Sequence, residues 1–196
     1  MDKQIYTLGG AAWINLINTA YVSNKRKIDI LDNSATTLHW LVENELLSET
    51  DSLAFAKEES SDLIISDLQF MRELSKSMLY DLEQQGSLSQ DTTEQFNNLI
   101  KQVDVKLTLD LGSNKLKVVA KGLTTRDHVL YQIIQSIIQT IETTAVSRIR
   151  KCEHAECQLH FVDTSKSGRR RWCSMELCGN RQKAADFYAR NKKKRK

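Results

Sequence analysis

The four cysteines of this chain have the residue type and the spacing of a metal-binding site. Cys152 and Cys157 form one pair, Cys173 and Cys178 form a second, and four residues lie inside each pair. Two close pairs joined by a short loop can bring four thiolates to one tetrahedral ion. Zinc suits such a site because it favours thiolate ligands and has no redox chemistry. The spacing therefore predicts one structural Zn²⁺ ion held by all four cysteines.

Two histidines leave a second ligand set open. His154 lies inside the first pair and His160 shortly after it, so either imidazole could replace a thiolate in a site of three cysteines and one histidine. We favour four cysteines, because the two pairs already supply four ligands, and we place His160 and Phe161 on a strand. Four free or disulfide-bonded cysteines are the alternative without a metal. Their paired spacing and the reducing compartment expected below disfavour it.

The residues around the cysteines predict a compact module that ends in a helix. A Thr, Ser and Gly cluster at 164–168 predicts a turn, and Ser174 is a candidate N-cap for a helix through about residue 189. Two ligands near the start of a final helix, facing an earlier pair, suggest a treble-clef-like zinc finger. A module this small buries little apolar area, so the metal would supply much of its folding energy.

Charge is divided unequally along the chain. The 196 residues carry 28 Lys/Arg and 25 Asp/Glu, a net charge of +3. Fifteen of these basic and five of these acidic residues lie at 148–196, a net of +10, which leaves 1–147 with a net of −7. This asymmetry predicts an acidic domain over 1–147, a basic zinc finger over 148–191 and a basic, disordered tail at 192–196.

The basic module favours a nucleic acid as its partner. Arginine can bind phosphate or guanine through two parallel hydrogen bonds, and a metal-ordered helix would present it. A solvated basic face is the plainer interpretation of such a charge run, and we assign Trp172 to the cover of the metal core rather than to base stacking. Six cations are the expected DNA contacts: Arg169, Arg170, Arg171, Arg181, Lys183 and Arg190.

Most of residues 1–147 has the periodicity of helices, and the chain has no proline to interrupt them. Apolar residues at spacings of three and four predict helices over 11–20, 34–46, 61–85, 89–99 and 125–147, the second, fourth and fifth capped by Ser34, Ser89 and Thr125. Residues 105–111 and 116–120 alternate apolar and polar side chains around a Gly/Asn turn, which predicts a β-hairpin. The expected fold class is mostly α with a β-hairpin (α+β), followed by the small zinc finger.

Two polar features of the acidic domain are candidates for ligand binding. Asn15, Asn18 and Thr19 share one helical face, where an exposed surface or hydrogen bonding at the helix end is the plainer interpretation. Arg72 lies amid apolar residues of a predicted helix. A surface ion pair is the simpler interpretation of this arginine, and binding of an anionic ligand is the functional one.

The sequence carries no signature of catalysis or of a membrane. It has no phosphate loop, nucleophile elbow or His-Glu helix motif, and a zinc site with four protein ligands has no open position, so we expect no enzyme. No apolar segment approaches the roughly 18 residues that span a bilayer, and the N-terminus lacks the pattern of a signal peptide. We expect a cytoplasmic protein with reduced thiols and no membrane partner.

The segment that holds the cysteines resembles the bacterial CGNR zinc finger. The namesake tetrapeptide is Cys178-Gly179-Asn180-Arg181, and the preceding Arg-Arg-Trp-Cys-Ser-Met stretch, residues 170–175, makes the resemblance specific. The upstream part is similar, more weakly, to the ABATE domain that commonly precedes this finger, through Asn18-Thr19, the Trp40-Leu41 region and the helix around Arg72.

The resemblance implies a bacterial stress-associated transcription regulator close to the nucleoid. All four cysteines would bind zinc, the finger would bind DNA, and the N-terminal domain would sense a small-molecule ligand, with Asn18 and Arg72 as candidate contacts, or would mediate oligomerisation as a homodimer. Two alternatives stay open. One is an adaptor whose finger binds an acidic protein, and the other is a zinc-thiolate redox switch in which oxidation ejects the metal.

Overall fold

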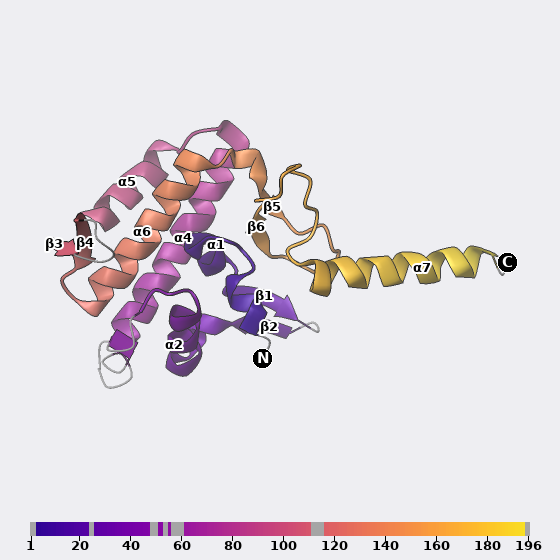
Figure 1. Ribbon diagram of the computed structural model, residues 1–196, viewed down its shortest axis with the longest axis horizontal. Coiled ribbons are helices and arrows are strands. Elements are labelled where there is room, and N and C mark those ends of the chain that lie inside the picture. The colour runs from indigo at the N-terminus through magenta and orange to yellow at the C-terminus, as the bar shows by residue number, and fades with distance from the viewer. Residues whose placement is uncertain are drawn as a thin grey trace.

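The computed structural model describes residues 3–23, 26–47, 51–52, 55, 61–110 and 116–194. The expected mostly helical fold is confirmed, and the described strands form three separate two-stranded antiparallel sheets, one of them the predicted hairpin (Figure 1). None of the described helices is long and apolar enough to span a membrane. In chain order the elements are η1 (Lys3–Thr7), α1 (Ala12–Ile17), β1 (Ala20–Ser23), β2 (Arg26–Asp29), η2 (Ile30–Asp32), α2 (Ser34–Glu43), α4 (Ser61–Gln85), α5 (Gln90–Ile100), β3 (Val105–Asp110), β4 (Lys117–Gly122), α6 (Thr125–Thr143), η4 (Val146–Arg148), β5 (Ile149–Lys151), β6 (His160–Val162), η5 (Met175–Gly179) and α7 (Asn180–Lys194).

The main core lies where the short helix α1 packs against the two long helices α4 and α6. Trp13 of α1, Leu68 and Met71 of α4, and Ile133 of α6 are all fully buried there. Burial of side chains of this size is the main favourable contribution to folding. The wide apolar stripe predicted for α6 is thus at the centre of the domain, and α4 spans the predicted 61–85.

Two predicted N-cap residues are wrong by one position, although both helices begin at the predicted residue. Asn33, not Ser34, caps α2, since its side-chain oxygen accepts hydrogen bonds from two backbone N–H groups of the first turn. Thr124, not Thr125, caps α6, and it forms a reciprocal capping box with Asp127. In both helices the residue that caps must still have extended backbone, so that its side-chain oxygen can reach the N–H groups two or three residues later.

Other boundaries also differ from the prediction. α1 ends at Ile17, and the next residues turn into the β1–β2 hairpin, which the sequence did not indicate because each strand has only four residues. α6 ends at Thr143 rather than near residue 147. At the other end, α7 is helical through Lys194, three residues into the segment predicted to be a disordered tail.

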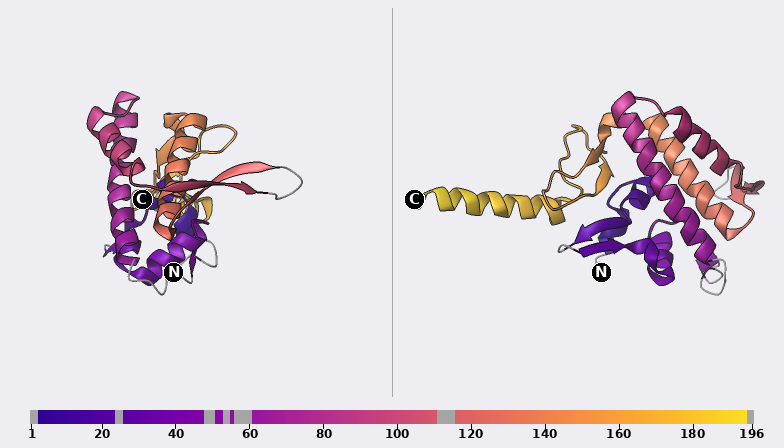
Figure 2. Two further views of the ribbon diagram at one scale, coloured as in Figure 1. Left: turned by 90° about the vertical axis from the view of Figure 1, so that its left-hand side faces the viewer. Right: turned by 180° about the vertical axis from the view of Figure 1, so that it is seen from behind.

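The predicted hairpin of β3 and β4 forms, with Val105 opposite Gly122 and Asp110 opposite Lys117. Its expected turn, at 112–114, lies outside the described residues. The hairpin extends from the helices as an arm in the left view of Figure 2. Its apolar side chains are largely exposed to solvent, unlike those that α1, α4 and α6 contribute to the main core.

A buried ion pair joins β2 to α4. The Arg72 guanidinium donates two hydrogen bonds of 2.7 Å to the Asp29 carboxylate and a third, of 2.9 Å, to Thr19. Arg72 is only 7% exposed, so the prediction of a surface ion pair is wrong about its location. Burial alone would raise the pKa of Asp29, but the hydrogen bonds and charge of Arg72 outweigh it and lower that pKa.

Replacing Arg72 with Met would leave the Asp29 carboxylate without its partner. We expect the free energy of unfolding, measured by denaturant titration, to fall by about 3 kcal/mol. Because the pKa of Asp29 is lower in the folded chain than in the unfolded chain, the stability that its carboxylate contributes is present above the unfolded pKa and is lost as pH falls through the folded pKa. The difference in free energy of unfolding between variant and parent should therefore become smaller in acid. Lys76→Met, which breaks the exposed pair with Glu73 on the same helix, is the control, with an expected loss below about 0.5 kcal/mol. Equal losses for the two variants would contradict the prediction.

Candidate metal centre and its basic surface

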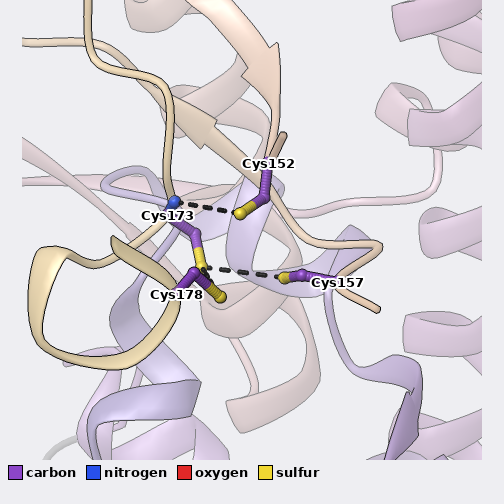
Figure 3. Close-up of side chains that lie close together, drawn as sticks. All are labelled: Cys152, Cys157, Cys173 and Cys178. Atoms are coloured by element: carbon purple, nitrogen blue, oxygen red, sulfur yellow. Dashed lines mark hydrogen bonds between the residues drawn. The ribbon is translucent and has the colours of Figure 1, made fainter. Parts of the chain in front are cut away.

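The first cysteine pair lies in the connection between β5 and β6. The backbone N–H of Cys152 donates to the carbonyl of Leu159 at 2.9 Å, and that of Cys157 donates to the carbonyl of His154 at 2.9 Å. These bonds close a tight turn between the two strands. The turn brings two thiol groups, with four residues between them in the sequence, to the same side of the backbone (Figure 3).

The second pair brackets the start of the final helix. Ser174 caps this segment as predicted, with its Oγ accepting from the N–H of Leu177 at 3.3 Å. The single turn η5 follows, and the N–H of Cys178 donates to the Ser174 carbonyl at 3.1 Å. Cys173 and Cys178 therefore lie at the base of α7, so the position of that helix is tied to the cysteine cluster.

The four sulfur atoms converge on one point. Their Sγ atoms all lie within 4.8 Å of one another, and Figure 3 shows the four side chains pointing inward. Sγ of Cys173 is 3.8 Å from that of Cys157 and 3.7 Å from that of Cys178. A zinc ion with Zn–S bonds of about 2.3 Å separates its ligand atoms by about 3.8 Å in a tetrahedron. The cluster therefore fits one zinc ion, and neither His154 nor His160 belongs to this group of described ligand atoms.

The thiols need a cation before all of them ionise. Hydrogen bonds from the neighbouring Cys157 and Cys173 thiols lower the pKa of Cys152, and the same contacts raise the pKa values of Cys157 and Cys173. Burial, with the charge of its neighbours, raises the pKa of Cys178 to about 12. One thiolate thus forms readily, and its charge suppresses the ionisation of the other thiols. A bound divalent cation would allow all four thiols to ionise, because it binds each thiolate directly and offsets part of their mutual repulsion.

A small second core surrounds the cysteines. Phe161 lies on β6 as predicted and is fully buried against the cysteine side chains, together with Leu159. Trp172 is partly buried against the same cluster, in agreement with its assignment to the cover of the metal core. Apolar side chains on this scale contribute little stability alone, so we expect the metal to supply much of the folding energy of the module.

Asp163 organises the loop between the two cysteine pairs, a role that the motif analysis did not assign. Its carboxylate is 1% exposed and accepts from the N–H of Ser165 and from that of Arg170, both at 2.9 Å. Gly168 completes the turn with φ of +62°, a conformation that glycine adopts without strain. The Asp-Thr-Ser sequence is the signal that could have indicated this turn, because aspartate often accepts from the N–H two residues later.

Arg170 differs from the other predicted DNA contacts because its guanidinium is engaged inside the module. It donates from Nε to the Trp172 carbonyl at 2.9 Å and from Nη2 to the Cys173 carbonyl, and it lies over the Phe161 ring at 4.5 Å. These contacts hold the chain on either side of a zinc ligand. Its contact with DNA stays a prediction, but the structure gives this side chain a supporting place beside the metal.

The remaining predicted contacts are exposed around the base and along the length of α7. Arg171 bonds to Glu153 at 2.6 Å and lies over Trp172, with 57% of its side chain still accessible. Arg190 donates to a carbonyl one turn earlier in α7. The exposed set is Arg169, Arg171, Arg181, Lys183 and Arg190.

Asn18, a candidate ligand contact, connects the zinc finger to the rest of the chain. Its amide nitrogen donates to the His160 carbonyl and its oxygen accepts from the His160 N–H, both at 2.8 Å. Ile149 and Val162, from β5 and β6, are buried in the main core. Asn18 is 3% exposed, so it is not on an exposed face, and ligand binding by Asn18 or by the paired Arg72 stays a prediction.

A cavity that sequence reasoning missed lies at the base of the hairpin arm. Its volume is about 590 Å³, in the range of small-molecule sites, and neither Asn18 nor Arg72 is among its described lining residues. Lys106 and Lys121 of the hairpin contribute two cations to its lining, which also contains Asp51 and Arg126 of α6, and Arg126 is paired with Asp67. No short motif signals it, because its walls come from α4, the hairpin and α6.

We expect one zinc ion per chain by metal analysis, and loss of it in the Cys173→Ser variant. A structural zinc site contributes about 10–16 kcal/mol over four ligands, so removal of one ligand should weaken zinc binding by about 100-fold or more. His154→Ala is the control, with zinc affinity unchanged. Zinc loss in that control, or a folded and metal-free parent module, would contradict the four-cysteine site.

Because Arg170 contacts the chain beside Cys173, we expect its removal to weaken the retention of zinc. Arg170→Ala removes two hydrogen bonds to carbonyls and the contact over Phe161, so a competing chelator should extract zinc about 10-fold more readily. The neighbouring Arg169→Ala changes an exposed cation and should leave zinc retention as in the parent. If the two variants release zinc alike, Arg170 has no supporting role.

Comparison with known families agrees with this geometry. The family model of the CGNR zinc finger matches residues 148–191, which include all four cysteines and the start of α7. No curated protein matches the chain. Residues 148–191 are thus a CGNR zinc finger, and its four cysteines are placed to hold one structural zinc ion.

Proposed function

We propose that this protein is a transcription regulator that binds DNA through its zinc finger, a treble-clef-like module in which zinc fixes the base of α7. The observation that carries the proposal is the exposure of five cations beside the metal centre and along α7. α7 extends away from the body of the molecule in Figure 1, so a polyanion can approach it from several sides. Arginine and lysine in this setting release counterions from DNA and gain affinity.

The exposure of α7 itself supports a macromolecular partner. Residues 183–190 are exposed on every side of the helix. A helix of 15 residues without a packed face is marginal in water, and an α-helix fits the major groove of DNA. The acidic domain would repel DNA, which favours contact through the finger rather than through the whole surface.

The N-terminal domain, similar to the ABATE domain, would sense a ligand or mediate oligomerisation. The cavity at the base of the hairpin, through Lys106 and Lys121, is the stronger candidate for an anionic small molecule than Asn18 and Arg72, which have internal partners. The hydrogen bonds of Asn18 to β6 give a direct route by which a change in the domain could reach the finger. In this proposal the protein is not an enzyme and acts in the cytoplasm, at the nucleoid.

A second candidate is an adaptor that binds an acidic protein. It is favoured by Phe187 and Tyr188, which lie together on α7 and are 56% and 73% exposed. Aromatic side chains flanked by cations can occupy a groove on a partner protein. The redox switch draws on the same thiols, and zinc loss with disulfide formation under mild oxidant would distinguish it.

DNA binding predicts a steep dependence on salt. If the five exposed cations neutralise about five phosphates, the logarithm of the association constant should fall against the logarithm of salt concentration with a slope near −4.5. Arg181→Ala should reduce the slope by about one and weaken binding to all duplexes. Fluorescence anisotropy with labelled duplexes measures both quantities.

Lys101→Ala, an exposed cation at the end of α5 and outside the finger, is the matched control and should leave the slope unchanged. No binding to any duplex at low salt by the zinc-loaded chain would refute the DNA proposal. The adaptor is separated from the regulator by competition, because an adaptor keeps its protein partner in excess DNA.

A further inference from the structure

One face of the hairpin arm is an exposed apolar surface without charge. In an antiparallel pair, residues two apart on one strand and their partners opposite share a face. Leu107 lies opposite Ala120 and Leu109 lies opposite Val118, which places them on one face. Its large members are Val105 (44% exposed), Leu107 (73%), Leu109 (65%), Leu116 (68%) and Val118 (64%). We call this set the apolar hairpin face.

The opposite face of the same hairpin carries the charge. Lys106, Lys117 and Lys121 occupy the alternate positions of the two strands, so the apolar hairpin face contains no lysine. Monomeric proteins rarely expose a contiguous apolar patch above roughly a few hundred Å² unless it binds something. A two-stranded hairpin that packs only at its base is also marginally stable alone. Both points indicate that the apolar hairpin face is covered in the functional protein.

We propose that a second copy of this chain covers it, with the two hairpins stacked face to face as a four-stranded sandwich. An uncharged apolar face favours an uncharged apolar partner. The apolar hairpin face of a second copy is such a partner, with the same width, length and strand spacing. In a two-fold arrangement each copy presents the same patch, and the lysines of both copies lie on the outer faces, away from each other. DNA or an acidic protein would instead select the lysine face.

The position of the arm is compatible with this dimer. The hairpin and α7 lie at opposite ends of the molecule in Figure 1 and in the right view of Figure 2. Stacking of two hairpins therefore leaves both zinc fingers accessible. Five side chains per copy make a small interface, of the class that forms weak or transient complexes. We expect a dimer with a dissociation constant in the micromolar range rather than an obligate one.

The test is the oligomeric state of the zinc-loaded full chain by sedimentation, without DNA, so its outcome is independent of DNA binding. Dimerisation of the parent should rise with concentration. Leu107→Thr with Val118→Thr keeps strand propensity but removes apolar area from both copies, so the dimer dissociation constant should rise at least about 100-fold. The matched control is Lys106→Thr with Lys117→Thr. Each lysine directly precedes one of the two substituted residues but lies on the opposite face, so this variant should dimerise like the parent. Circular dichroism and zinc content establish that both variants fold.

A second measurement needs no variant. In hydrogen exchange of the parent chain, the amides of β3 and β4 should gain protection as concentration rises, because stacking suppresses opening of the hairpin. A parent that stays monomeric to about 1 mM would overturn the proposal. So would equal dimerisation of the two double variants, or protection that rises elsewhere and not in the hairpin.

Discussion

Four thiol groups that lie within 4.8 Å of one another can all ionise only around a cation, and the shape of the C-terminal module follows from that constraint. The metal centre is where three segments meet: the turn between β5 and β6, the loop that ends at Trp172, and the base of α7. Around it, Arg170 and Asp163 satisfy backbone groups that a module of this size could not otherwise hold in place. We therefore expect metal binding to fix the direction of α7, and with it the exposure of its cations.

The zinc finger is also part of the larger fold. Ile149 and Val162 belong to the main core, and the N–H of Val162 donates to the carbonyl of Gly9 at 2.8 Å. Together with the two hydrogen bonds of Asn18, these contacts attach β6 to the residues on both sides of α1. A change of charge at residue 148, which suggests two separate modules, does not by itself indicate a flexible joint.

The sequence indicates local features well and long-range partners poorly. The long helix α4 and its end at Gly86 (φ +71°) follow from apolar periodicity and glycine chemistry, both of which are local. The cysteine cluster is predictable because each pair forms its own turn. The partners of Arg72 and Asn18, by contrast, are 43 and 142 residues away, and no spacing rule reports them. A polar residue on an apolar helix face could pair internally or bind a ligand, and only the fold decides.

The hairpin arm and α7 have one physical property in common: each is regular structure with little tertiary burial. Isolated hairpins and short helices gain too little from backbone hydrogen bonds alone to offset their conformational entropy, so each would gain stability from association. Their surfaces differ in chemistry, because α7 presents cations on a polar helix and the apolar hairpin face presents none. A polyanion therefore selects the first and an apolar sheet selects the second. The two surfaces can act in the same complex without competing for one partner.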